Sequence, residues 1–333
     1  MRNTLLTVLV LSLGMFTSCG SSDTKQTDAA NTVIEEVNGF DYLIKHLERN
    51  NDVINSSDAP WVVKAEAVYK ELKGNNHLVD LRSADDFKNG HIEGAVNVDQ
   101  KNIINYLLND IIPSKIDKII LVDNTGNQSA YVTSMLRHLG YANIHALKFG
   151  MSGWNNDYYK QYWGKVIDAA KTLALDTTTV EKAKAITYPK FPTCESTCAE
   201  ALEKRCIDLL NNPYTEKSLT ADELMANAEK YYIITYWPEA LYKAGHIKGA
   251  VNYIPKKSLK RTADLKTLPL DKTIVVYCYG GHHSAAVAAF LTLIGYDAKT
   301  LEYGANSFMH ETLKTNNWKA LLPGALRNYP YIK

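Results

Sequence analysis

Residues 77–98 have the sequence HLVDLRSADDFKNGHIEGAVNV, and residues 232–253 have the sequence YIITYWPEALYKAGHIKGAVNY. Both stretches contain the run Gly-His-Ile-x-Gly-Ala-Val-Asn. His91 aligns with His246, an offset of 155 residues, and this offset holds without a gap as far as Tyr141. An ungapped register of this length indicates an internal repeat, so the fold is expected to consist of two copies of one unit.

Each copy alternates short apolar stretches with amphipathic ones. Strands separated by helices predict a parallel sheet covered on both faces. Thr220 and Glu223 form the pattern of a capping box, which predicts a helix over 221–229. The sequence therefore predicts an α/β fold of two repeated domains, each a small parallel sheet flanked by helices on both faces. The predicted strands are 77–81, 95–98, 118–122 and 143–147 in the first copy, and 232–235, 250–253, 273–277 and 298–301 in the second.

The composition is that of a folded globular protein. A chain of 333 residues fits two domains of ordinary size, and 46% of its residues are hydrophobic. The 37 basic and 36 acidic side chains nearly cancel, so net charge gives no reason to expect nucleic acid as a partner. We also expect no cofactor.

The first residues predict export. Arg2 precedes an apolar run from Leu5 to Phe16, which is shorter than the about 20 residues needed to cross a bilayer. A small residue, then Cys19, then glycine resemble the lipobox of bacterial lipoproteins, in which the cysteine is acylated. We therefore expect a membrane partner through lipidation of Cys19 and a location in the bacterial cell envelope, on the periplasmic side or at the outer membrane. A plain signal peptide cut nearby is the alternative.

The leader and the repeat together predict five segments. They are a lipoprotein signal peptide at 1–19, a flexible tether at 20–35, a first domain at 36–164, a helical connector at 165–217 and a second domain at 218–333.

The connector contains three cysteines, Cys194, Cys198 and Cys206. In an exported chain, a structural disulfide that involves two of them is one interpretation. Three thiols also suggest zinc, but no fourth ligand lies nearby in the sequence, so no metal site is predicted. A third alternative is that one of them is a resolving thiol that accepts sulfur from Cys278.

A loop with the composition of an anion site follows the predicted strand 273–277. Ligand sites in parallel sheets lie beyond the carboxyl ends of the strands. Backbone N–H groups of a glycine-containing loop converge at a helix start, and the helix dipole adds to their field. Both effects favour thiolate over thiol, so Cys278 is predicted to be nucleophilic. The loop consists of Cys278, Tyr279, Gly280, Gly281, His282, His283 and Ser284.

The Gly-His-Ile-x-Gly-Ala-x-Asn element, paired with the Cys-x-x-Gly-x-x-Ser loop, resembles the rhodanese family in both repeats. The resemblance implies a sulfurtransferase whose loop cysteine takes sulfane sulfur from a small donor, such as thiosulfate or a low-molecular-weight persulfide, and passes it to a thiol acceptor. Cys278 would then be the nucleophile, and the rest of the loop would cradle the persulfide. The alternatives are a non-catalytic rhodanese-like module that binds a small anion or a protein partner, and an inert Cys278 in a decayed domain.

The first copy has Asp123 in place of the cysteine, so it cannot carry sulfur. Its carboxylate is expected to occupy the anion site of its own loop. In the second copy, His283 stands where the family usually has arginine, so the loop has lost its fixed charge. Anion binding is then expected to improve as pH falls through the histidine range. Tyr236 and Trp237 are expected to give the site a less polar entrance.

Two further interpretations of the histidines and the loop are set aside. A phosphatase-type or arsenate-reductase-type site needs an arginine six positions after the cysteine, where this chain has Ser284. The same histidine occurs in both copies, as His91 in the copy without the cysteine and as His246 in the copy with it. We therefore expect both histidines to be structural.

Overall fold

The computed structural model describes residues 39–170, 172–184, 187–191 and 198–333. The predicted signal peptide with Cys19, the predicted tether and Cys194 lie outside these ranges. Among the helices in the described ranges, none combines the length and the apolar composition needed to cross a membrane.

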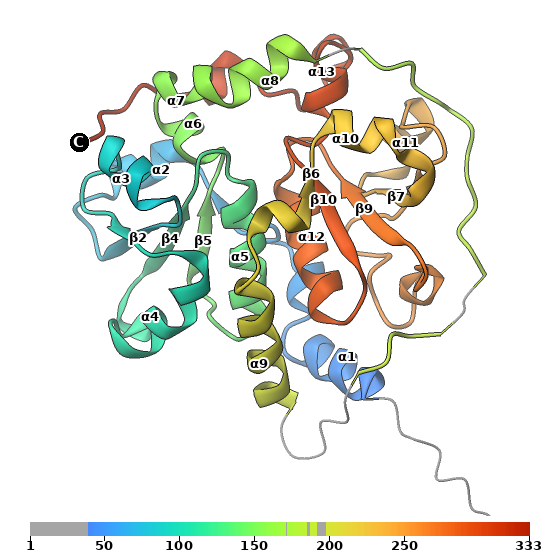
Figure 1. Cartoon of the computed structure of the whole chain (residues 1–333), viewed down its shortest axis with the longest axis horizontal. Helices are drawn as coiled ribbons and strands as arrows, with labels where there is room; N and C mark the ends of the chain where they lie inside the picture. Colours follow the sequence, from blue (N-terminus) through green and yellow to red (C-terminus); the bar gives the residue numbers. More distant parts are fainter. Residues whose placement is uncertain (1–38, 171, 185–186, 192–197) are drawn as a thin grey trace, which may run out of the picture. The chain divides into compact units, whose positions relative to one another are not determined.

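Each repeat forms a five-stranded sheet whose paired strands are all parallel (Figure 1). The strand order is β1-β5-β4-β2-β3 in the first sheet and β6-β10-β9-β7-β8 in the second, so the sequence repeat is a repeat of topology. The eight predicted strands are confirmed to within one or two residues at their ends. The strands are β1 (Val62–Val63), β2 (Asn76–Asp80), β3 (Val96–Asn97), β4 (Lys118–Val122), β5 (Ile144–Leu147), β6 (Ser218–Leu219), β7 (Tyr231–Thr235), β8 (Val251–Asn252), β9 (Thr273–Tyr277) and β10 (Ala298–Leu301).

Helices connect the strands within each repeat, and further helices precede, link or follow the two sheets along the chain. The α-helices are α1 (Phe40–Arg49), α2 (Ala65–Lys70), α3 (Ala84–Asn89), α4 (Ile103–Asn109), α5 (Asn127–His138), α6 (Gly150–Trp154), α7 (Asn156–Gln161), α8 (Trp163–Ala169), α9 (Cys198–Leu210), α10 (Ala221–Ala226), α11 (Glu239–Ala244), α12 (His282–Leu293) and α13 (Asn306–Thr315). Short 3-10 helices span Val53–Asn55, Gln100–Asn102, Pro113–Lys115, Tyr214–Lys217, Ala228–Lys230, Leu265–Thr267 and Pro323–Ala325. The predicted capping box of Thr220 and Glu223 starts α10, which ends three residues earlier than expected.

Apolar side chains project from both faces of each sheet, because successive residues of a strand point to opposite faces. In β4, Ile119 and Leu121 pack in the cluster that contains α5, while Ile120 and Val122 pack in the cluster that contains α2 and α6. The second sheet divides in the same way between α12 on one face and α10 with α13 on the other. This confirms the prediction that helices cover both faces of each sheet.

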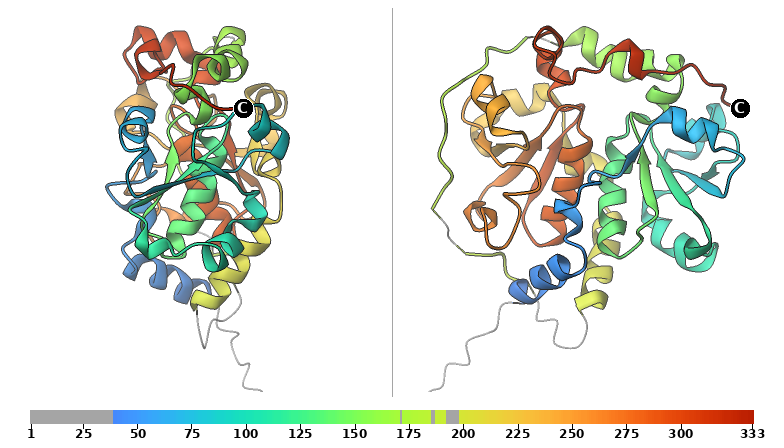
Figure 2. Two further views of the ribbon diagram at one scale, coloured as in Figure 1. Left: turned by 90° about the vertical axis from the view of Figure 1, so that its left-hand side faces the viewer. Right: turned by 180° about the vertical axis from the view of Figure 1, so that it is seen from behind.

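The helices α5 and α12 join the two repeats. They lie next to each other between the two sheets (Figures 1 and 2), and their apolar side chains belong to one core cluster. In α12 every residue except His283 is buried, and four of its buried residues are alanines, which let the helices approach closely. The hydroxyl of Ser134 in α5 donates to the carbonyl of Ala286 in α12 at 2.8 Å. The N-termini of α5 and α12 carry the two loops singled out by the sequence.

The segment between the repeats is only partly helical. It forms α9, but its described residues between 172 and 191 contain no helix. Instead Asp176 forms an antiparallel bridge with His246, and the N–H of Leu173 donates to the carbonyl of Phe308 at 3.2 Å. Residues 165–169 are helical in α8, but the expected helix is wrong for the described residues from 172 to 191, because three consecutive threonines and a valine at 177–180 have low helix propensity.

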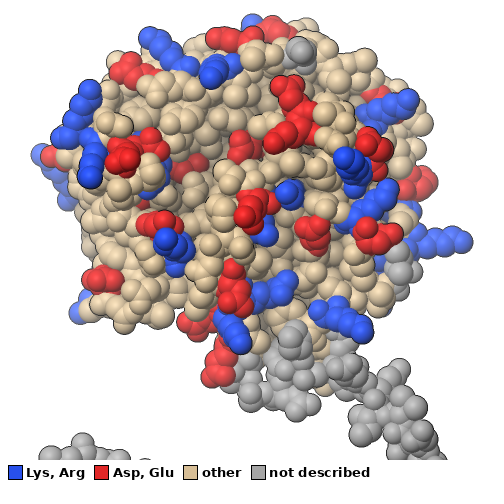
Figure 3. All heavy atoms as spheres, viewed as in Figure 1, with Lys and Arg blue, Asp and Glu red and all other residues tan. Residues whose placement is uncertain are grey.

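Charged side chains of both signs are interspersed over the face drawn in Figure 3. No region of a single sign dominates this face, in agreement with the balance of 37 basic and 36 acidic residues.

Candidate active site

Cys278 lies at the end of β9, where the chain turns into α12, and only 3% of it is exposed. Gly281 makes the turn with a φ of 82°, a conformation that glycine adopts without steric cost. The backbone N–H of Ser284 donates to Sγ of Cys278 at 3.4 Å, and the sulfur lies 3.6 Å from the hydroxyl oxygen of Ser284. That hydroxyl is fixed, since it donates to the carbonyl of Gly281 at 3.0 Å and accepts from the hydroxyl of Thr300 at 2.9 Å.

Asp123 occupies the same place in the first repeat, and its carboxylate fills the loop as expected. One oxygen accepts from the N–H of Gly126 and the hydroxyl of Ser129, both at 2.7 Å. The other accepts from the N–H groups of Thr125 at 3.2 Å and Gln128 at 3.3 Å. Burial raises the pKa of Asp123, although these hydrogen bonds act in the opposite direction.

The two loops contact each other through equivalent hydrogen bonds. The N–H of Phe149 in the first repeat donates to Nε2 of His282 at 3.0 Å, and the N–H of Tyr303 in the second donates to Oδ1 of Asn127 at 2.8 Å. Asn127 aligns with His282 in the repeat. The amide of Asn127 also donates to the carbonyl of Gly280 at 3.0 Å, so the first repeat holds the cysteine loop directly.

The histidines of the loop are neutral near neutral pH. Burial lowers the pKa of His283 to about 4, and its Nε2 donates to the carbonyl of Ala59 at 2.8 Å. Burial, with a smaller contribution from Lys148, lowers the pKa of His282 to about 3. The expectation that His283 gains charge as pH falls through its usual range is therefore wrong, because the imidazole is buried and already has a partner.

A pocket of about 250 Å³ opens at Cys278 and contains two lysines, Lys148 and Lys319. Although the loop itself carries no arginine or lysine, positive charge reaches the pocket from outside it. Sequence reasoning missed both lysines, because Lys148 belongs to the other repeat and Lys319 lies on the segment after α13. The pocket is lined by Pro60, Val62, Lys148, Phe149, Cys278, Tyr279, Gly280, His282, His283, Asn306, Lys319 and Leu321.

Tyr236 and Trp237 were expected to form the entrance to the site, but both are buried inside the domain. Other residues form that entrance. Tyr236 and Trp237 are 2% and 0% exposed, and neither lines the pocket at Cys278. The ring of Tyr236 packs edge-on against His283, with centroids 5.5 Å apart, and the ring of Trp237 stacks on Tyr279 at 5.4 Å. Both rings therefore support the loop from inside the domain.

His91 and His246 form equivalent local contacts in the two repeats. Nδ1 of His91 donates to the carbonyl of Phe87 at 2.8 Å, and Nδ1 of His246 donates to the carbonyl of Tyr242 at 2.7 Å. Each imidazole stacks on the ring of the same residue four positions earlier. This agrees with a structural role for both.

Cys206, on α9, is a buried free thiol, and burial raises its pKa. It is therefore not part of a disulfide and is poorly suited to accept sulfur as a thiolate. Cys278 is also a free thiol, so no permanent bond blocks it. No group of three or more metal-ligating side chains is found among the residues that the structure describes.

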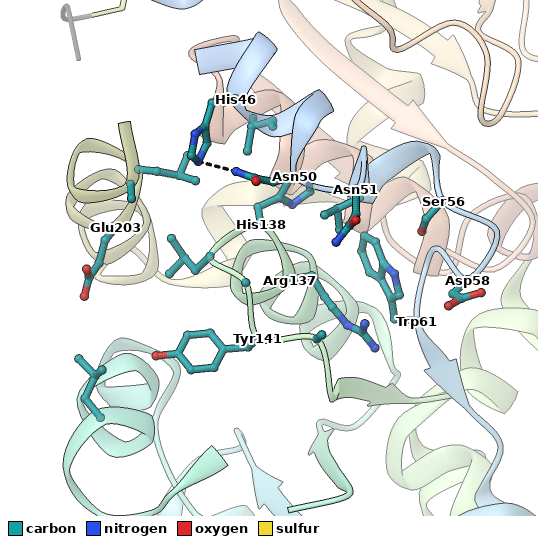
Figure 4. Close-up of a pocket in the computed structure, with 18 residues that line it drawn as sticks. His46, Asn50, Asn51, Ser56, Asp58, Trp61, Arg137, His138, Tyr141 and Glu203 are labelled. Carbon is teal, nitrogen blue, oxygen red and sulfur yellow. Dashed lines mark hydrogen bonds between the residues drawn. The ribbon is translucent and has the colours of Figure 1, made fainter. Parts of the chain in front are cut away.

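A larger pocket of about 560 Å³ lies at the carboxyl end of α5 (Figure 4). Its lining residues include no cysteine and none that line the pocket at Cys278. The side chains of Trp61, Arg137 and Tyr141 border it, and the amide of Asn50 lies 2.9 Å from Nε2 of His46. The nucleophile and the two lysines thus single out the smaller pocket as the candidate active site.

Comparison with known proteins finds the rhodanese-like domain twice, over residues 64–157 and 220–311. The uncharacterized protein YibN of Escherichia coli is 31% identical over 110 residues, which are 33% of this chain and 77% of that protein. A protein described as the thiosulfate sulfurtransferase GlpE of Shewanella oneidensis is 29% identical over 79 residues, 23% of this chain and 74% of its own.

Solved structures give weaker likenesses. A thiosulfate sulfurtransferase from Pseudomonas aeruginosa is 16% identical, with a TM-score of 0.28, and covers 78% of this chain and 46% of its own. A rhodanese-related protein from Thermoplasma volcanium is 26% identical, with a TM-score of 0.27, and covers 35% of this chain and 97% of its own. The family assignment therefore rests on the two sequence matches and not on these superpositions.

Proposed function

Because the chain belongs to the rhodanese-like family, we propose that it is a sulfurtransferase that carries sulfane sulfur as a persulfide on Cys278. The donor is thiosulfate or a low-molecular-weight persulfide, and the acceptor is a thiol. The relatives described as thiosulfate sulfurtransferases, which are 26% to 29% identical to parts of this chain, support the reaction class.

The strongest support comes from the first repeat, where the carboxylate of Asp123 fills the equivalent loop. Its oxygens stand one bond beyond Cγ, as the outer sulfur of a persulfide stands one bond beyond Sγ. The backbone N–H groups of Thr125, Gly126 and Gln128 donate to those oxygens.

By the offset of the repeat, these N–H groups correspond to those of Gly280, Gly281 and His283. The second loop therefore has amides placed for an anion one atom longer than the cysteine side chain, while Ser284 contacts Sγ itself. Preorganised donors of this kind stabilise a persulfide anion without rearrangement of the loop.

The proposed reaction has two balanced steps. The thiolate of Cys278 attacks the outer sulfur of thiosulfate, the sulfur–sulfur bond of the donor breaks, and sulfite leaves with the electron pair. An acceptor thiolate then attacks the outer sulfur of the persulfide and takes it, and the Cys278 thiolate leaves with the electron pair. No external oxidant or reductant is needed.

The location remains a proposal drawn from the leader. Acylation of Cys19 would tether the domains to a membrane of the cell envelope, and nucleic acid is not proposed as a partner. Cys19→Ser would release the protein from the membrane fraction and abolish incorporation of labelled fatty acid.

Sulfur loading tests the proposed function. The full chain and Cys278→Ser are incubated with thiosulfate and, separately, with glutathione persulfide, and the peptide that contains Cys278 is analysed by mass spectrometry. We expect a gain of about one sulfur atom on Cys278 that a thiol acceptor removes. If no donor loads wild type, the module is a binder of anions or partners and the sulfurtransferase proposal is rejected.

A further inference from the structure

Two ammonium groups face the candidate active site from outside the catalytic loop. Lys148 follows β5 of the first repeat, and Lys319 follows α13 of the second. Nζ of Lys148 lies 5.0 Å from the ring centroid of Phe149, and Nζ of Lys319 lies 5.2 Å from that of Tyr279. Both rings and both lysines line the pocket that contains Cys278.

Neither ammonium group forms an ion pair or a hydrogen bond with the side chains or backbone that the structure describes. Lys148 is half-buried, and burial lowers its pKa, with smaller contributions from the charges of Lys64 and Lys319. Lys319 is exposed, so the repulsion between the two like charges acts mainly on the partly desolvated Lys148, and a bound anion relieves it.

The two loops differ in the charged residue that the opposite repeat places beside them. Lys148 is the residue after β5, and Glu302 is the residue after β10, so the two occupy equivalent places. Burial raises the pKa of Glu302, and the nearby charge of Asp123 raises it further. The loop with the cysteine is thus faced by a cation from the opposite repeat, and the loop with the aspartate by an acidic residue.

We propose that Lys148 and Lys319 bind the anionic leaving group of the sulfur donor, which makes a small sulfonyl-type anion such as thiosulfate the preferred donor class. The inference rests on the proposed function. In this arrangement the loop amides hold the transferred sulfur, and the two lysines stabilise the negative charge that sulfite carries away. The first repeat is then a part of the active site that determines donor specificity.

Kinetics with two donors test the inference on the full chain, with cyanide as the acceptor probe. Thiosulfate is a dianion, and methanethiosulfonate is a monoanion that transfers its outer sulfur by the same cleavage. We expect Lys148→Gln and Lys319→Gln each to lower kcat/KM for thiosulfate about 10-fold. The loss with methanethiosulfonate should be smaller, and Lys148→Arg and Lys319→Arg should retain most of the activity.

Matched controls separate local recognition from general charge. Lys64→Gln removes a charge that acts on Lys148 but does not line the pocket at Cys278, and Lys314→Gln removes the charge of an exposed residue on α13 that does not line it either. Both should stay within about 2-fold of wild type, because neither residue lines the pocket at Cys278 and salt screens charges that lie farther away. Lys148→Glu copies the acidic residue of the other repeat and should lose more than Lys148→Gln.

Binding of thiosulfate to Cys278→Ser, measured by calorimetry, separates this inference from the proposed function. Weaker binding after Lys148→Gln or Lys319→Gln supports the inference even if wild type transfers no sulfur. Equal binding in all variants overturns it, as does an equal loss of kcat/KM for both donors or a loss as large in the two controls. Such results would leave sulfur transfer through Cys278 untouched.

Discussion

The backbone N–H of Phe149 donates a hydrogen bond of 3.0 Å to Nε2 of His282, so the first repeat holds the residue of the cysteine loop at which α12 begins. A neutral imidazole with its proton on Nδ1 is required for this bond, in agreement with the lowered pKa of about 3. Asn127 accepts from Tyr303 in the equivalent place. The repeat without the cysteine therefore supports the cysteine loop of the other repeat.

Loss of the acceptor at position 282 should loosen the loop. We predict that His282→Leu lowers the free energy of unfolding by about 1–3 kcal/mol, because the buried N–H of Phe149 is left without a partner. His282→Asn should be milder, since Asn127 accepts the equivalent bond with its amide oxygen. Urea unfolding and the rate of sulfur loading measure both effects. Equal effects of the two substitutions would contradict this role.

The buried histidines should make the protein sensitive to acid. Burial lowers the pKa of His138 to about 4, of His282 to about 3 and of His283 to about 4, against a usual value near 6.5. Between about pH 6.5 and pH 4 the unfolded chain binds more protons than the folded one. Stability is therefore fully present above about pH 6.5 and falls as the pH drops toward 4.

Urea midpoints at several pH values test this dependence. His283→Gln keeps a donor for the carbonyl of Ala59 but cannot gain a proton, so it should flatten the fall in stability. His46→Gln, at a half-buried position, is the control for loss of a histidine. A midpoint that does not change between pH 7 and pH 5 in wild type would show that these imidazoles are not held neutral by the fold.

The carboxylate of Asp123 should stabilise the first repeat. In Asp123→Asn an amide group would face donors from Gly126, Ser129, Thr125 and Gln128, and at least one buried donor would lose its acceptor. We predict a loss of about 1–3 kcal/mol in the free energy of unfolding. Thermal unfolding at neutral pH measures it, and an unchanged midpoint would mean that the carboxylate does not anchor the loop.

Gly304 lies against the cysteine loop with a φ of 55°. A Cβ atom there would come within 2.7 Å of the nitrogen of Gly281 and 2.9 Å of that of Gly280, and would collide with the carbonyl of Cys278. Gly304→Ala should therefore lower sulfur loading strongly. Gly249→Ala is the control, because Gly249 has a φ of 80° with nothing within 4 Å of its Cβ position. Gly249→Ala should lower the free energy of unfolding by only about 1–2 kcal/mol, through backbone strain. Equal loading in the two variants would show that the loop tolerates displacement.

The repeat allowed much of the fold to be predicted, because a constant offset fixes equivalent elements in both copies. Strands β4 and β9 are five residues long and strongly apolar, so they were found to the residue. The edge strands β1 and β6 were missed because two residues carry no periodic pattern, whereas the equally short β3 and β8 belong to the repeated Gly-His-Ile-x-Gly-Ala-Val-Asn run. The lysines of the pocket were missed for another reason. Lys148 comes close to Cys278 only through packing of the two repeats, and Lys319 only through the path of the chain after α13, and local sequence patterns encode neither.

A single-turnover experiment with thiosulfate labelled in its outer sulfur tests the central claim most directly. In the absence of an acceptor, the full chain should release about one equivalent of sulfite and retain an equal amount of label on Cys278. Cys278→Ser should release no sulfite and retain no label. Sulfite release by Cys278→Ser, or the absence of added sulfur on Cys278 of wild type after incubation with thiosulfate and with glutathione persulfide, would contradict persulfide transfer through this residue.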